Sequence, residues 1–161
     1  MKRYFPSYPL CVKDPYFSIW KGSEILNESN VTFWYGTEKK LYGILKIDGV
    51  PYEFMGNYGG LKKMEQTDLK LTSFTTDYKF VANDVTLSLS FVSPLPLDDM
   101  KTLSCPVCYV NYKIESNNTH KYEIALVMDE IMCYNVDQRV KERGIVGGVF
   151  DLDDFEAAWF G

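Results

Sequence analysis

A seven-residue segment of alternating side chains restricts the fold of this chain more than any other feature. In residues 85–91, VTLSLSF, every odd position is large and apolar and every even position is serine or threonine. Side chains alternate between two faces along a β-strand, so this period of two places the apolar set on one side. The segment is therefore predicted to be a strand with one buried face and one face toward water or a polar layer.

Two later segments, residues 108–114 and 122–128, repeat the alternation. Three alternating strands in succession, joined by short polar links, indicate one antiparallel sheet packed on one face. Further strands are expected at 16–20, 31–35, 41–47, 50–55, 64–75, 77–82 and 155–161. Between 41–47 and 50–55, Asp48-Gly49 tolerates the positive φ angles of a tight type I′ turn. The expected fold class is all-β, an antiparallel β-sandwich with little helix.

The remaining segments are predicted to be connections. Residues 1–12, with two prolines, are expected to form an extended arm on the body of the domain, and Asp14-Pro15 to begin a turn. Residues 133–148 lose the alternation, with one helical turn possible at 137–143, and the acidic stretch 151–154 is expected to be a polar loop. A length of 161 residues with a 46% apolar share suits a single domain over 1–161.

The charge distribution argues against two classes of partner. The net charge is −5, and the lysines and arginines are not clustered as a nucleic-acid surface requires. No apolar run approaches the 18 residues of a membrane span, and the start, MKRYFP, lacks the apolar segment of a signal peptide. We expect no nucleic acid, no membrane and a cytoplasmic location.

The residue types of common catalytic and metal sites are sparse. Cys105 and Cys108 have C-x-x-C spacing, but they enter a predicted strand and no second pair completes a zinc site, so we interpret them as reduced structural thiols. His120 is the only histidine and is expected to be an exposed loop residue. No catalytic residue, metal ligand or cofactor is predicted.

A group of large aromatic side chains leaves two interpretations open. Tryptophan faces stack well on sugar rings, so these residues are candidates for a sugar-binding platform. Alternatively, they fill the core or an interface between domains. The group consists of Tyr16, Trp20, Trp34, Tyr35 and Trp159.

Several motifs resemble one protein family. Residues 12–20, VKDPYFSIW, resemble the opening of the glutaminase A family, whose pattern runs near DPYFSIW. Residues 34–36, 41–44, 47–49 and 52–56 follow in the order that the family shows, and so do 91–94, 103–104 and 106–110. The resemblance covers almost the whole chain. Its first motif is fairly specific, whereas the later motifs support the resemblance through their order along the chain.

The resemblance implies a fold and a context. Family members have an N-terminal, supersandwich-like β-sandwich followed by a helical toroid, and glutamine hydrolysis to glutamate and ammonia is attributed to some of them. The chain would then be the N-terminal sandwich of a longer protein, inactive alone, with the helical catalytic domain as its partner. Asp14, Tyr16, Trp20 and Trp34 are expected to face that domain or its substrate.

Two alternatives to this accessory role stay open. One is an independent carbohydrate-binding module, and the other is an assembly domain. The apolar segment 155–161, at the end of the sequence, is expected to expose a strand edge through which the chain self-associates.

Overall fold

Strands dominate the computed structural model, which describes residues 5–129, 132, 147–152 and 155–160. The single helix of these residues is α1 (Met100–Ser104). The strands are β1 (Tyr8–Asp14), β2 (Phe17–Lys21), β3 (Val31–Phe33), β4 (Glu38–Lys39), β5 (Leu41–Ile47), β6 (Val50–Met55), β7 (Lys62–Lys63), β8 (Glu65–Leu71), β9 (Thr75–Ala82), β10 (Val85–Val92), β11 (Tyr109–Ser116), β12 (Tyr122–Met128), β13 (Gly147–Leu152) and β14 (Phe155–Phe160). The predicted all-β class is confirmed.

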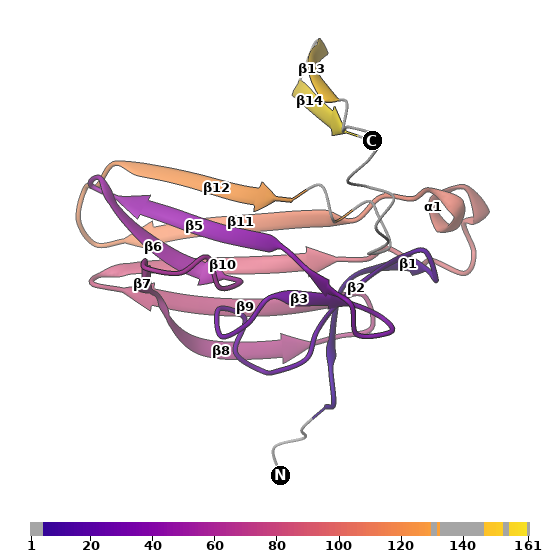
Figure 1. The fold of residues 1–161 in the computed structure, drawn as a ribbon, viewed down its shortest axis with the longest axis horizontal. Helices are drawn as coiled ribbons and strands as arrows, with labels where there is room; N and C mark the ends of the chain where they lie inside the picture. The colour runs from indigo at the N-terminus through magenta and orange to yellow at the C-terminus, as the bar shows by residue number, and fades with distance from the viewer. Residues whose placement is uncertain (1–4, 130–131, 133–146, 153–154, 161) are drawn as a thin grey trace.

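The strands form three four-stranded sheets and one separate hairpin (Figure 1). Their orders are β1-β2-β3-β4, β11-β10-β9-β8 and β12-β5-β6-β7, and β13 pairs with β14. Neighbouring strands are antiparallel except for the short parallel pair of β6 and β7. None of the helical structure in the described residues is long and apolar enough to cross a membrane.

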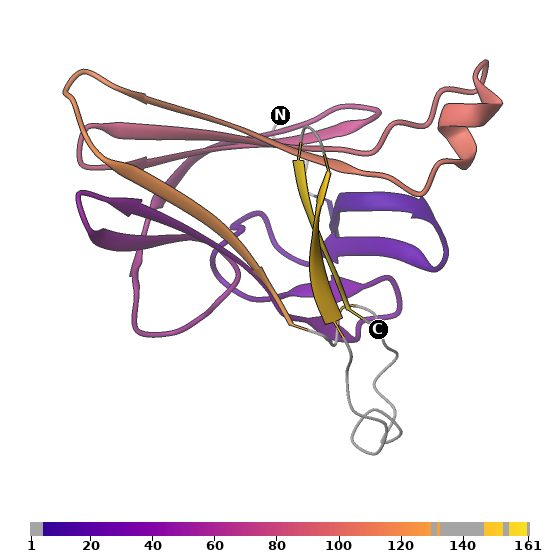
Figure 2. The ribbon, with the colours of Figure 1, turned by 90° about the horizontal axis from the view of Figure 1, so that it is seen from above.

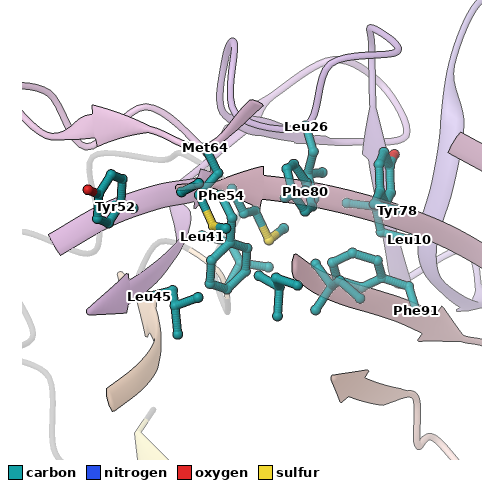
Figure 3. Close-up of a cluster of buried hydrophobic side chains, with 14 of the residues drawn as sticks. Leu10, Leu26, Leu41, Leu45, Tyr52, Phe54, Met64, Tyr78, Phe80 and Phe91 are labelled. Atoms are coloured by element: carbon teal, nitrogen blue, oxygen red, sulfur yellow. The ribbon is translucent and has the colours of Figure 1, made fainter. Parts of the chain in front are cut away.

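The core lies between the β10 sheet and the β5 sheet (Figure 3). Leu45 and Phe54 come from one sheet and Phe80 and Leu87 from the other, and all four are fully buried. The Phe54 and Phe80 rings meet across the layers with centroids 6.1 Å apart. Each such side chain contributes about 1.5–3 kcal/mol by leaving water, so this packing holds the two sheets together.

The predicted alternation of residues 85–91 is confirmed. Val85, Leu87, Leu89 and Phe91 are at most 2% exposed, and the residues between them are half-buried. The predicted hairpin turn is also present, because Asp48 and Gly49 both have positive φ. Here local sequence chemistry and tertiary packing favour the same conformation.

The expectation that the three alternating segments share one sheet is wrong. β10 pairs with β11, but β12 pairs with β5 in the opposite layer. The turn between β11 and β12 explains the change, because it is bonded to the β5–β6 turn. Lys121 N donates to Asp48 Oδ1 at 2.9 Å, and Asp48 N donates to Lys121 O at 3.0 Å. These bonds direct the chain along β5.

Two predicted connections are also corrected, and the structure adds a helix that the sequence analysis did not predict. From Tyr8 onward the N-terminal arm is β1, which pairs with β2 and buries Tyr8 and Leu10. Asp151 and Leu152, predicted as part of a polar loop at 151–154, belong to β13, which pairs with the predicted last strand, β14. Residues 100–104 form α1, begun by Asp99, whose side chain accepts from the backbone N–H groups of Lys101 and Thr102.

Two expectations about chain organisation stay predictions. The helical turn at 137–143 lies outside the described residues. The assignment of 1–161 to a single domain is untested.

Candidate functional site

The first predicted site residues are Asp14, the last residue of β1, and Tyr16, in the turn between β1 and β2. Asp14 Oδ1 accepts hydrogen bonds from the backbone N–H groups of Tyr16 at 2.7 Å and Phe17 at 3.0 Å. This is the local side-chain turn that an Asp-Pro pair favours. It holds the Tyr16 ring in solvent, where 93% of the residue is exposed.

Of the other two, Trp20 lies on β2 of the same sheet, and Trp34 lies in the turn after β3. Trp20 is half-buried in β2, and its Nε1–H donates to Ser18 Oγ at 2.7 Å. Trp34 follows β3 and is 61% exposed. Its ring meets Tyr35 edge-on, with centroids 5.4 Å apart, and Tyr35 in turn packs on Phe33. The turn therefore presents a small aromatic cluster.

The four predicted residues thus lie on or beside one sheet, β1-β2-β3-β4: Asp14 and Trp20 are in its strands, and Tyr16 and Trp34 are in two separate turns. The core interpretation is wrong for Tyr16, Trp34 and Tyr35, which are 45–93% exposed. The side chain of Trp159 lies outside the described residues. Aromatic stacking and apolar contact are the interactions that this surface offers.

A second surface, which the sequence did not reveal, lies at the edge formed by β11 and β12. Paired residues in an antiparallel sheet share a face, and Val110, Tyr112 and Ile114 pair with buried residues of β10. Likewise Ile124, Leu126 and Met128 pair with core-facing positions of β5. We call these six inward-facing side chains the open edge.

The open edge is only partly covered. Tyr112 is 56% exposed beside Leu89, which is 2% exposed, and Met128 is 55% exposed beside Leu41 at 8%. β11 and β12 leave their common turn and separate along their length (Figure 2). Each is the last strand of its sheet within the described chain. Apolar side chains and unpaired strand edges together are typical of a surface that another segment covers.

The turn that joins the two halves of the open edge is held by His120. Its Nδ1 lies 2.6 Å from Asp48 Oδ2, and its Nε2 lies 3.1 Å from Asp84 Oδ1. The expected exposed loop residue is therefore half-buried and connects three turns. The carboxylates raise the pKa of His120, Asp48 first. Hydrogen bonds from Asn118, Ser116 and His120 lower the pKa of Asp84 to about 2.

Buried charged side chains form a third group, near the β2–β3 connection. Lys21 is fully buried, and its Nζ donates to Ser29 O at 2.7 Å. Burial lowers the pKa of Lys21 to about 8, although Glu28 opposes the change. Glu53 is also fully buried and accepts from Tyr58 N. These contacts hold loops against the β5 sheet and leave neither group open to a substrate.

The described residues contain no group of three or more histidine, cysteine and acidic side chains arranged to hold a metal ion. The C-x-x-C cysteines do not act as a pair. Cys105 is exposed, whereas Cys108 Sγ lies 3.6 Å from Ser93 Oγ, which bonds to both neighbours of Cys11 in β1. No spacing rule relates Cys11 to Cys108, so the sequence carried no signal for this contact.

Comparisons with known proteins divide the chain into two matched parts. Residues 3–68 match the domain of unknown function DUF4964, and residues 74–140 match the domain of unknown function DUF5127. Over 132 residues, the chain is 28% identical to Glutaminase A of Aspergillus oryzae (strain ATCC 42149 / RIB 40). This match covers 77% of the chain and 19% of the relative, so the chain spans about a fifth of that protein. No solved structure matches the chain.

Proposed function

We propose that the chain is a non-catalytic β-sandwich region of a glutaminase-like hydrolase, and that it packs against the remainder of that protein. The open edge carries this proposal, because six apolar side chains that face the sandwich interior are only partly covered. The similarity to part of Glutaminase A supports it. The role is to brace a helical catalytic domain and to form one wall of its substrate cleft.

The occupant of the open edge is, in this proposal, a segment of the same polypeptide beyond the described residues. The matched relative has about four-fifths of its length outside the match, which is ample chain to supply it. Covering Tyr112, Leu126 and Met128 removes apolar surface from water at about 25 cal/mol per Å². An added strand would also pair the free main-chain groups of β11 or β12.

The aromatic turns provide a second contact with the catalytic domain. The Asp14 hydrogen bonds hold Tyr16 outward without a further loss of backbone entropy on association. Trp20 lies between them and the Trp34 cluster. In the longer protein, Trp20→Ala is expected to lower turnover or the stability of the interface. Unchanged turnover and melting would remove these turns from the proposed interface.

The decisive experiment places serine at the open edge of the longer protein. The double variant Leu126→Ser, Met128→Ser should lower both the melting temperature and glutamine hydrolysis, since the packed side chains lose their apolar contacts. The matched control is Val127→Ser, which lies between them on the opposite face and is 39% exposed. Equal effects of the two variants would contradict packing through the open edge.

A carbohydrate-binding module is the second candidate, favoured by the exposed rings of Tyr16 and Trp34. Chain 1–161 applied to a glycan array should then bind, and Trp34→Ala should abolish binding. Self-association of the chain, measured by analytical ultracentrifugation, would instead support an assembly role.

A further inference from the structure

Two cysteines connect parts of the chain that are far apart in sequence. Cys11 lies in β1, and Cys108 lies immediately before β11. Ser93 links them, because its Oγ bonds to both neighbours of Cys11 and lies 3.6 Å from Cys108 Sγ, and both cysteines are partly exposed. Cys11 belongs to the part that matches DUF4964, and Cys108 belongs to the part that matches DUF5127. The contact therefore spans the two matched regions.

The position of Cys108 is set by Ser93, just after β10. Ser93 Oγ accepts from Val12 N at 3.0 Å and lies 3.4 Å from Leu10 O, so it bonds to both neighbours of Cys11. The same oxygen lies 3.6 Å from Cys108 Sγ. One buried hydroxyl thus holds the sulfur of Cys108 beside the β1 residues that flank Cys11.

The surroundings favour a negative charge on Cys108. The pKa of Cys108 is lowered to about 6, mainly by a hydrogen bond from the Cys11 thiol. Burial raises this pKa, whereas Ser93, the Lys13 ammonium and the Val12 N–H lower it further. Lys13 Nζ is held in place by Pro94 O and Thr102 O. The pKa of Cys11 is raised by the same hydrogen bond and by burial, so Cys11 keeps its proton.

We propose that Cys108 and Cys11 form a thiol–disulfide exchange site whose co-reactant is a low-molecular-weight disulfide. The Cys108 thiolate attacks one sulfur of that disulfide, forming a mixed disulfide and releasing one thiolate. Cys11 then loses its proton and attacks Cys108 Sγ, which releases the second thiol. Two cysteine thiols are oxidised by two electrons, and one external disulfide is reduced to two thiols.

The second step is favoured by the loss of charge in the first. Once Cys108 carries a mixed disulfide, the thiolate that raised the pKa of Cys11 is gone. The resulting Cys11–Cys108 bond joins β1 to the start of β11 and closes a long loop. Constraining the unfolded chain in this way should raise the melting temperature by about 10 °C.

The chain offers a matched control in Cys105. It is exposed and lines a surface hollow of about 360 Å³ with Lys101 and Tyr109, so it is accessible to reagents. It is also the partner that the C-x-x-C spacing would have assigned to Cys108. If exposure alone controlled reactivity, Cys105 would react at least as fast as Cys108. Faster reaction at Cys108 therefore supports the proposed site.

The test exposes reduced chain 1–161 to glutathione disulfide at pH 7 and maps the products by mass spectrometry. The expected product links Cys11 to Cys108. Cys11→Ser should trap glutathione on Cys108, whereas Cys105→Ser should leave the internal link unchanged. A main product that links Cys105 or Cys133 to Cys108, or equal glutathione on Cys105 and Cys108 in the Cys11→Ser variant, would overturn the proposal.

An alkylation profile tests the thiolate without relying on the disulfide. The rate of iodoacetamide reaction at Cys108 should level off above about pH 7, while that at Cys105 should keep rising toward its ordinary pKa near 8.5. Ser93→Ala should move the Cys108 midpoint upward, and Ser93→Thr, which keeps the hydroxyl, should restore it. Identical profiles for Cys105 and Cys108 would contradict the assignment.

Discussion

The closed centre of the sandwich and its open edge carry the same alternating pattern with different outcomes. Leu89 of β10 is 2% exposed, while Tyr112, its partner on β11, is 56% exposed on the same face. Across the sandwich, Leu41 and its partner Met128 differ in the same way. A period of two reports which face a side chain occupies. Burial depends in addition on whether another layer lies opposite that face.

The largest expected effect comes from emptying the closed centre. Phe80→Ala should cost about 3–5 kcal/mol in free energy of unfolding, because Phe80 is fully buried against Phe54. Tyr112→Ala, on the inner face of the neighbouring β11, should cost under about 1 kcal/mol because the side chain is half in water. Urea unfolding of chain 1–161 measures both. Similar costs would mean that the open edge is closed in solution.

A close approach within the closed centre gives a smaller effect. A Cβ at Gly43 of β5 would overlap the ring carbons of Phe54. Gly43→Ala should therefore cost about 1–3 kcal/mol, since the ring must leave its packed position. Gly22→Ala is the control, because nothing lies within 4 Å of the added atom, and it should change stability by less than about 0.5 kcal/mol. Comparable melting of the two variants would show that the ring moves freely.

At the open edge, substitutions should change surface properties more than stability. In chain 1–161, the double variant Leu126→Ser, Met128→Ser should lower the free energy of unfolding by less than about 1 kcal/mol. It should reduce binding of a dye that reports exposed apolar surface, because the two residues are 42% and 55% exposed. Dye fluorescence and urea unfolding give the two readouts. Unchanged fluorescence with a large loss of stability would show that these two side chains are buried in the core and do not form an exposed apolar surface.

The smallest effect is expected at the turn where β11 meets β12. The pKa of His120 is raised by Asp48 and Asp84, so its stabilisation is present below the ordinary value near 6.5 and is lost as the pH rises through the raised value. The stability difference between the chain and His120→Gln should therefore shrink from pH 6 to pH 8.5. Cys108, whose pKa is lowered, contributes stability with the opposite pH dependence, and this contribution cancels because both proteins contain it. A pH-independent difference would mean that the imidazole charge plays no part.

The fold class could be predicted from local pattern because neighbouring residues decide it. Val85 to Phe91 alternate and Asp48-Gly49 accepts positive φ, and both features are present. β1 was missed because the two prolines and the aromatics of residues 1–12 resemble an arm, and the buried face of β1 shows only through the pairing with β2. β13 was missed because the segment contains two glycines and an aspartate, and only its pairing with β14 makes it a strand.

The candidate sites were less predictable than the fold. Tyr16 and Trp34 were selected for their residue types, and the structure adds that both are exposed. The contacts of His120 with Asp48 and Asp84, and of Ser93 with Cys108 and the neighbours of Cys11, join distant segments. A single sequence carries no local signal for such contacts.

The sequence by itself determined that the chain forms strands, where most of them lie and which side of each is apolar, because strand period and turn chemistry act over a few residues. Only the tertiary structure decided that β12 joins β5 and not β11, and that Tyr112, Leu126 and Met128 remain partly exposed. The physical reason is that sheet membership is set by hydrogen bonds between distant segments. Burial, in turn, requires a second surface that no property of the strand itself provides.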